Sequence, residues 1–366
     1  MATNFEQDLL ERAFDALRAL LDEGDSGLEL KPYPTALPDS GRDAAWEITA
    51  PNHTAQLLVE AFRRFTPRDV DRVLGGISPL VRKIMRDPPI LVVAPWLSSR
   101  ARDLLTERGI NYLDLTGNVR LRVARPSILL RLEGAQQDPD PPAKPPVRLQ
   151  GASINGLIRV LVDYEPPYRM VELARAARLS NAYVSRALET LDGERLIGRP
   201  PGSKVVTSVD WPNLLRARAA LYDMFKTNRG RGYISRSGPR HVYRQLAKVQ
   251  DDQAVVTGSF AASEFVHLAA PAQLALYVPN AQDFAQRYEL MPARQSANVV
   301  LLDAADESQL ERARQADQGA FHVGVSQAAL DCLAGNGRMP EEGEALVEWM
   351  IRNQTAWRRP ELPKRD

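Results

Sequence analysis

The residues of this chain best suited to contact nucleic acid lie close together near its middle. Arginine and lysine neutralise phosphate charges, and arginine, asparagine and serine form hydrogen bonds at base edges. Such side chains gather in two short segments, residues 178–186 and 199–204. The expected DNA contacts are Arg178, Ser180, Asn181, Tyr183, Ser185, Arg186, Arg199, Ser203 and Lys204.

The charge of this region favours the same interpretation. Between Val147 and Arg236 the chain has 15 lysine and arginine residues against 8 aspartate and glutamate residues, a net charge of +7. The whole chain carries only +1, so the rest sums to −6. A basic segment between acidic flanks fits binding to a phosphate backbone.

Three predicted helices and a hairpin position these residues. Helices are expected over 154–162, 170–177 and 181–191, followed by strands at 196–197 and 204–207. Val184, Leu188 and Leu191 repeat at helical spacing and should face the core, so that residues 181–186 project outward. This order resembles the winged helix-turn-helix of bacterial transcription regulators. The resemblance implies a homodimer that binds double-stranded DNA, with the start of the third helix in the major groove. The alternative is a helical bundle and hairpin that serve as a scaffold or a protein contact.

The N-terminal third alternates strands and helices and contains one carboxylate of interest, Glu60. The order strand, strand ending in Glu60, helix, strand, helix, strand resembles the restriction-endonuclease-like fold. That family cuts DNA with an Asp on one strand and Glu-x-Lys on the next, around a divalent cation. Here the lysine position holds Phe62, and the upstream acid would be Asp43 or Asp39. We therefore expect no catalytic residues, no metal, no cofactor and no enzymatic activity. The competing hypothesis is a metal-dependent nuclease in which Arg63 supplies the missing cation.

A second polar group in this third follows a predicted strand. Asp114, Thr116 and Asn118 surround Gly117, and Trp96 follows the preceding apolar strand. The simplest interpretation is a hairpin turn, since Gly-Asn favours positive φ. The alternative is an effector pocket formed by Glu60, Trp96, Asp114, Thr116 and Asn118, for single-stranded DNA or a small molecule.

The C-terminal third is again α/β, with strands expected at 254–257, 274–278, 299–302 and 321–325. The order strand, Gly258-Ser259, helix, strand is similar to the opening of nucleotidyltransferase-like folds. The paired carboxylates of those enzymes are missing, because no acidic residue follows the strand at 274–278 until Asp283. With the winged helix, this third resembles the AbiEi-like family of bacterial regulators and antitoxins. The segments that carry the resemblance are 257–262, 275–278, 298–302 and 325–329. The resemblance adds a third hypothesis, a type IV antitoxin that neutralises a toxin by contact.

Composition sets the remaining bounds. The 366-residue chain is 44% hydrophobic and 25% charged, as globular proteins are, and it is long enough for several domains. One cysteine, Cys332, excludes an internal disulfide, and no run of 18 apolar residues is present. We expect a cytoplasmic protein without a membrane segment. The predicted parts are a nuclease-like domain (1–135), a proline-rich linker (136–146), the winged helix (147–210), a connecting helix with a basic loop (211–236) and the C-terminal domain (237–366).

Overall fold

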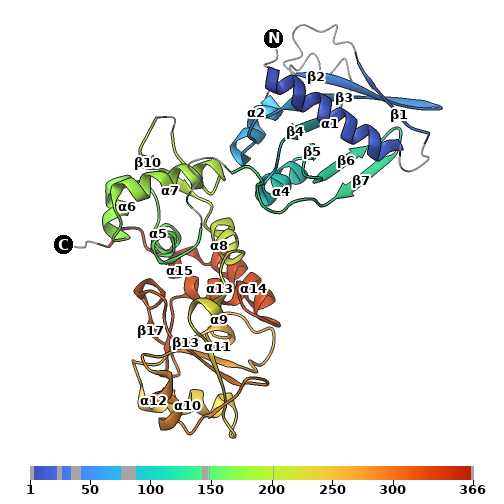
Figure 1. The fold of residues 1–366 in the computed structure, drawn as a ribbon. Helices are drawn as coiled ribbons and strands as arrows, with labels where there is room; N and C mark the ends of the chain where they lie inside the picture. Colours follow the sequence, from blue (N-terminus) through green and yellow to red (C-terminus); the bar gives the residue numbers. More distant parts are fainter. Residues whose placement is uncertain are drawn as a thin grey trace. The chain divides into compact units, whose positions relative to one another are not determined.

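The computed structural model describes residues 4–22, 27–33, 43–75, 88–141, 147, 149–200 and 202–363. The fold is mixed α/β with two seven-stranded sheets and many helices, which confirms the expected class (Figure 1). The chain divides into two compact units, residues 1–145 with 192–195, and residues 146–191 with 196–366. Within the described ranges, no helix is both long and apolar enough to cross a membrane.

The sheet of the first unit takes its strands in sequence order. The β3–β4 and β4–β5 pairs are parallel, and the other neighbours are antiparallel. The first three strands are β1 (Glu29–Pro32), β2 (Ala44–Ala50) and β3 (His53–Ala61). The others are β4 (Ile90–Ala94), β5 (Asn111–Asp114), β6 (Val119–Val123) and β7 (Ile128–Leu132).

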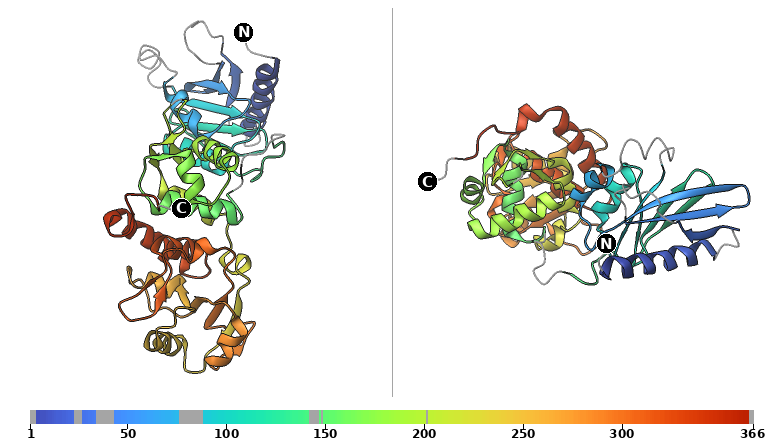
Figure 2. Two further views of the ribbon diagram at one scale, coloured as in Figure 1. Left: turned by 90° about the vertical axis from the view of Figure 1, so that its left-hand side faces the viewer. Right: turned by 90° about the horizontal axis from the view of Figure 1, so that it is seen from above.

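Helices cover both faces of this sheet. The helix α1 (Asn4–Asp22) buries an i, i+4 stripe of Leu9, Ala13, Leu17 and Leu21 against one face, along which Figure 2 shows it lying. The helices α2 (Val70–Gly75) and α4 (Ser99–Glu107) pack with residues of the opposite face. A short 3-10 turn, η1 (Pro67–Asp69), precedes α2 and begins with a capping box between Thr66 and Asp69.

The second unit begins with a small helical assembly. Its helices are α5 (Ala152–Asp163), α6 (Met170–Ala176) and α7 (Asn181–Gly193), and its strands are β8 (Tyr168–Arg169), β9 (Ile197–Gly198), β10 (Val205–Val206) and β11 (Ser208–Val209). The predicted core face of α7 is confirmed, because Val184, Leu188 and Leu191 are buried. The sequence missed β8, which lies between α5 and α6 and pairs with β10, while β9 pairs with β11.

The second seven-stranded sheet has the order β15-β12-β16-β14-β13-β18-β17. The expected C-terminal strands are confirmed as β13 (Val255–Thr257), β14 (Leu274–Tyr277), β16 (Val299–Leu302) and β18 (Phe321–His322). The remaining strands are β12 (Arg231–Ile234), β15 (Met291–Pro292) and β17 (Arg314–Gln315). The helices are α8 (Trp211–Ala219), α9 (Met224–Thr227), α10 (Pro239–Val249), α11 (Gly258–Ala262), α12 (Ala281–Arg287), α13 (Val325–Leu333), α14 (Met339–Arg352) and α15 (Gln354–Trp357), with the 3-10 turn η2 (Glu307–Gln309).

Residues 228–238, predicted to be a basic loop, contain the strand β12 instead. Tyr233 is buried, and β12 lies between β15 and β16. Gly232 permits this position, because a Cβ there would lie 2.6 Å from the carbonyl oxygen of Ala293. Two backbones approach each other closely here, which favours glycine in the strand. The same glycines led us to predict a loop from the sequence.

Candidate nucleic-acid interface

The first two turns of α7 present their polar side chains outward. Asn181, Ala182 and Arg186 are exposed, and Tyr183 and Ser185 are half-buried. The Arg186 guanidinium bonds only to the carbonyl oxygen of Ala182, and no carboxylate within the described ranges pairs with it. Burial raises the pKa of the Tyr183 hydroxyl, so this group stays neutral and can donate a hydrogen bond.

Arg178 and Ser180 form the turn that leads into α7. Ser180 accepts a hydrogen bond from the Tyr183 amide at 3.2 Å and so caps the helix. Arg178 has a left-handed backbone with φ of 56°, and its Nη1 lies 3.0 Å from Oε2 of Glu307. Both side chains of this ion pair are largely exposed, so the pair contributes little stability and a phosphate can replace the carboxylate.

The residues between β9 and β10 contribute the remaining predicted contacts. The Ser203 hydroxyl accepts a hydrogen bond from the Val205 amide at 3.0 Å, which shapes the turn. Lys204 is exposed, whereas Arg199 is half-buried. The nine predicted DNA contacts therefore lie at the start of α7, at the turn before it and at the hairpin after it.

In the first unit, Asp43 lies beside Glu60. Ala44 pairs with Val59 across β2 and β3, which brings the preceding Asp43 to the level of Glu60. The Asp43 carboxylate accepts a hydrogen bond from the Ala61 amide at 2.8 Å. The other proposed acid, Asp39, lies outside the described residues.

The positively charged side chain near Asp43 and Glu60 is that of Arg72 in α2, rather than that of Arg63. Its Nε lies 3.9 Å from Oε1 of Glu60, and its guanidinium lies 4.6 Å from the centre of the Phe62 ring. Arg63 instead covers the ring of Phe5 at 5.2 Å. Arg72 could not be identified from the sequence, because only the packing of α2 brings it to β3.

The donor set around Glu60 does not fit the divalent cation of the nuclease family. Phe62 is buried and cannot donate to phosphate or water, and the Asp43 carboxylate already binds a backbone amide. Arg72 also supplies positive charge where a cation would have to bind. In the described part of the chain, no group of three or more His, Cys, Asp or Glu side chains could hold a metal ion.

Four of the five residues predicted to form an effector pocket lie together, and the fifth, Glu60, lies on β3 near Arg72. The Asp114 carboxylate accepts hydrogen bonds from the amides of Leu97, Thr116 and Asn118 and from the side chains of Thr116 and Asn118. Asn118 also donates to the carbonyl oxygen of Ala135, as does the Trp96 indole. Asp114 and Asn118 are only 2% and 0% exposed, so water does not compete for their polar atoms. These atoms bind one another and fix the turn between β5 and β6.

The Gly258-Ser259 turn lies in a buried region of the second unit. Gly258 has φ of +61° and begins the five-residue helix α11. The next strand, β14, reads Leu-Ala-Leu-Tyr, and all four of its residues are buried. Thr257 donates to the fully buried Asp331, which also accepts bonds from Tyr222 and Tyr277. This group of side chains joins β13 and β14 to α13.

The Asp114 network generates a prediction about stability. We expect Asp114→Ala to destabilise the first unit by about 2–4 kcal/mol, because several buried donors would lose their acceptor. Thermal unfolding of the full chain measures the effect. Glu107→Ala, an exposed change on α4 in the same unit, should lie within about 0.5 kcal/mol of the wild type. Equal melting of the two variants would contradict the structural role of Asp114.

No family model and no curated protein matches this chain. The AbiEi-like resemblance therefore stays a prediction. Among solved structures, the chain is similar to the crystal structure of the Megavirus polyadenylate synthase, with a TM-score of 0.29 and 8% sequence identity. The match covers 56% of this chain and 45% of that chain, less than two thirds of its length.

This comparison corrects one expectation from the sequence. The absence of a complete catalytic motif led us to expect that the chain is not an enzyme. The matching protein is a synthase, which contradicts that expectation, and we do not retain it. A TM-score of 0.29 assigns neither a fold nor a reaction to this chain.

Proposed function

We propose that residues 147–210 form a winged helix that binds double-stranded DNA and that the chain regulates transcription. The observation that carries this proposal is the division of α7 into two faces. Val184, Leu188 and Leu191 are buried, while Asn181 and Arg186 face solvent at the N-terminal end. A recognition helix presents that end to base edges in the major groove.

The strand pairing supports the same function. Because β11 pairs with β9, these two strands form a hairpin that starts close after α7, and the segment between them includes β10, which pairs with β8. Lys204 lies in this hairpin and pairs with no carboxylate in the described part of the chain. A basic hairpin beside a recognition helix can hold the phosphate backbone that borders the groove.

A homodimer follows from the same proposal. One α7 helix reads only a few base pairs, and symmetric dimers place two such helices on half-sites about 34 Å apart. The operator would then be partly palindromic. Sedimentation of the complex with DNA measures its stoichiometry.

We predict that Arg186→Ala relaxes sequence preference. If Arg186 binds a base edge, its loss costs about 1–3 kcal/mol on the preferred sequence and much less on unrelated DNA. The preferred sequence is first selected from a random duplex library, and affinities are then measured by mobility shift. Arg352→Ala removes an exposed arginine from α14 and is the matched control, with unchanged affinity expected. Equal affinities of both variants for the selected sequence would refute the base contact.

Lys204→Ala should act differently, because a phosphate contact carries no sequence information. We expect weaker binding to every duplex and a plot of log affinity against log salt whose slope is smaller by about 0.9. Titrations at several salt concentrations, with selected and scrambled duplexes, measure both effects. A loss restricted to the selected sequence would reassign Lys204 to base recognition.

A metal-dependent nuclease is the second candidate function, favoured by the position of Asp43 beside Glu60. Because the donor set is incomplete, we derive no cleavage step from it. The candidate predicts nicking of supercoiled plasmid in Mg²⁺ or Mn²⁺ by the wild type and loss of nicking in Glu60→Gln. The exposed change Glu107→Gln should leave nicking intact. Plasmid that stays supercoiled with the wild type, or equal nicking by Glu60→Gln, would remove this candidate.

A further inference from the structure

The β6–β7 edge of the first sheet has one face lined with arginine. Val119, Leu121 and Val123 of β6 are buried on the face that α1 covers, so Arg120 and Arg122 lie on the other face. Across the ladder, Arg120 pairs with Arg131 and Arg122 pairs with Leu129. Directly opposite residues of an antiparallel pair share a face. We call these four residues, Arg120, Arg122, Leu129 and Arg131, the arginine face.

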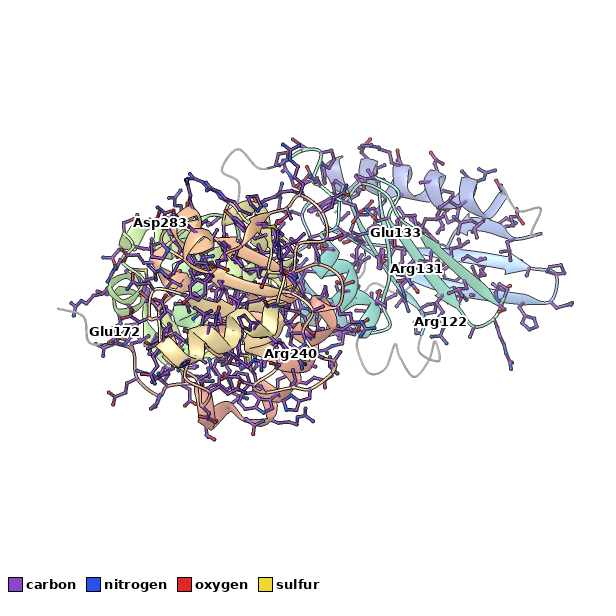
Figure 3. All side chains as sticks on the ribbon, turned by 90° about the horizontal axis from the view of Figure 1, so that it is seen from below. Arg122, Arg131, Glu133, Glu172, Arg240 and Asp283 are labelled. Carbon is purple, nitrogen blue, oxygen red and sulfur yellow. The ribbon has the colours of Figure 1, made fainter. Side chains whose placement is uncertain are left out.

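The charges of the arginine face are largely uncompensated. Arg122 and Arg131, labelled in Figure 3, are exposed and pair with no carboxylate in the described residues. Arg120 donates to the carbonyl oxygen of Ile110 at 3.3 Å, which leaves its charge intact. Leu129 between them is 76% exposed, the largest value among the exposed large hydrophobic residues. Unpaired cations around an exposed apolar side chain suit a ligand that is both anionic and apolar.

A polar pocket of about 130 Å³ adjoins this face. Its lining includes Arg131 from the arginine face, Ser99 and Arg102 from α4, Tyr112 and Gln136. Arg102 is only 9% exposed, and its Nη1 and Nη2 donate to Asn118 and Gln136. Among the described residues its Nε has no hydrogen-bond partner. Buried donors are nearly always satisfied, so an unpaired Nε beside a polar pocket indicates a missing acceptor.

Protection of a sheet edge does not account for this face. Charged residues on edge strands prevent association between sheets, and Arg131 on the terminal strand β7 could serve that purpose. Arg120 and Arg122, however, lie on β6, which is paired on both sides by β5 and β7.

We propose that the arginine face and its pocket bind a single-stranded nucleic acid, with one backbone phosphate in the pocket. Guanidinium groups bind phosphate oxygens in pairs, and their planes stack on bases. Leu129 offers an apolar contact to an unstacked base, which a duplex would hide. The carboxylates of Asp103 and Glu133 also line the pocket and can accept hydrogen bonds from base N–H groups. This proposal does not depend on the winged helix, which lies in the other unit.

The test measures binding of the full-length protein to a fluorescent oligothymidine strand by anisotropy. Arg122→Gln/Arg131→Gln should weaken binding about tenfold and lower the salt slope by about 1.4, for two lost phosphate contacts. Its affinity for duplex DNA should stay unchanged. The matched control is Arg240→Gln, which removes an exposed arginine from α10 in the other unit (Figure 3). Lys204→Ala should bind the single strand as the wild type does, which separates this site from the winged helix.

Several results would overturn the proposal. The first is that the wild type does not bind the single strand. The second is an equal loss of affinity in Arg240→Gln and in the double variant. The third is a loss of affinity in Lys204→Ala alone. Displacement of the strand by inorganic phosphate at micromolar concentration would also overturn it, in favour of a site for the free ion. If the double variant aggregates, Arg122→Gln alone on the interior strand decides, since a retained wild-type affinity would show that Arg122 does not bind the single strand. A photocrosslink from a thiothymidine strand to residues 119–136 would support the proposal.

Discussion

A buried ion pair at the end of α5 holds the second unit together. Arg159 and Asp163 are 1% and 2% exposed, and Nη2 of the arginine lies 3.1 Å from Oδ2 of the aspartate. Ser326 of α13 binds both side chains, and Arg312 lies 3.5 Å from Asp163. Loss of one partner from such a buried pair typically costs about 3–5 kcal/mol, because the other charge stays uncompensated. Helix α5 is therefore fixed to the C-terminal α/β part by charged side chains that are buried away from water.

This constraint changes how the proposed DNA-binding segment relates to its neighbours. From the sequence we expected it to be separate from the C-terminal domain, but the structure places both in one compact unit. Asn155 of α5 donates to Asp306 and Ser308 at 3.2 and 3.0 Å, and the adjacent Glu307 contacts Arg178 before α7. The 3-10 turn η2 thus contacts both α5 and the turn before α7, and the exposed Arg178–Glu307 pair is the weaker of the two contacts.

What the sequence could predict was local. The 3.6-residue spacing of Val184, Leu188 and Leu191 identified the buried face of α7, and Gly117 marked the β5–β6 turn, where its φ is +97°. Contacts between distant segments left no such pattern. The two-residue strand β8 exists only because Val205 and Val206 pair with it, and Arg72 reaches Glu60 only through the packing of α2. The arginine face is an intermediate case. Residues 119–123 read Val-Arg-Leu-Arg-Val, and this alternation is typical of a strand with one polar face. The pairing of Arg120 with Arg131 is known only from the strand register in the structure.

The two proposed nucleic-acid surfaces lie in different units of one chain, and this arrangement has an energetic consequence. When one surface holds DNA, the other is confined near the same molecule at an effective concentration set by the connecting segment, around residues 136–146. A strand displaced from a duplex close to the winged helix would then be bound far better than a free strand. Two weak phosphate-binding surfaces would in that way favour DNA that is partly duplex and partly open, a preference that neither surface could produce alone.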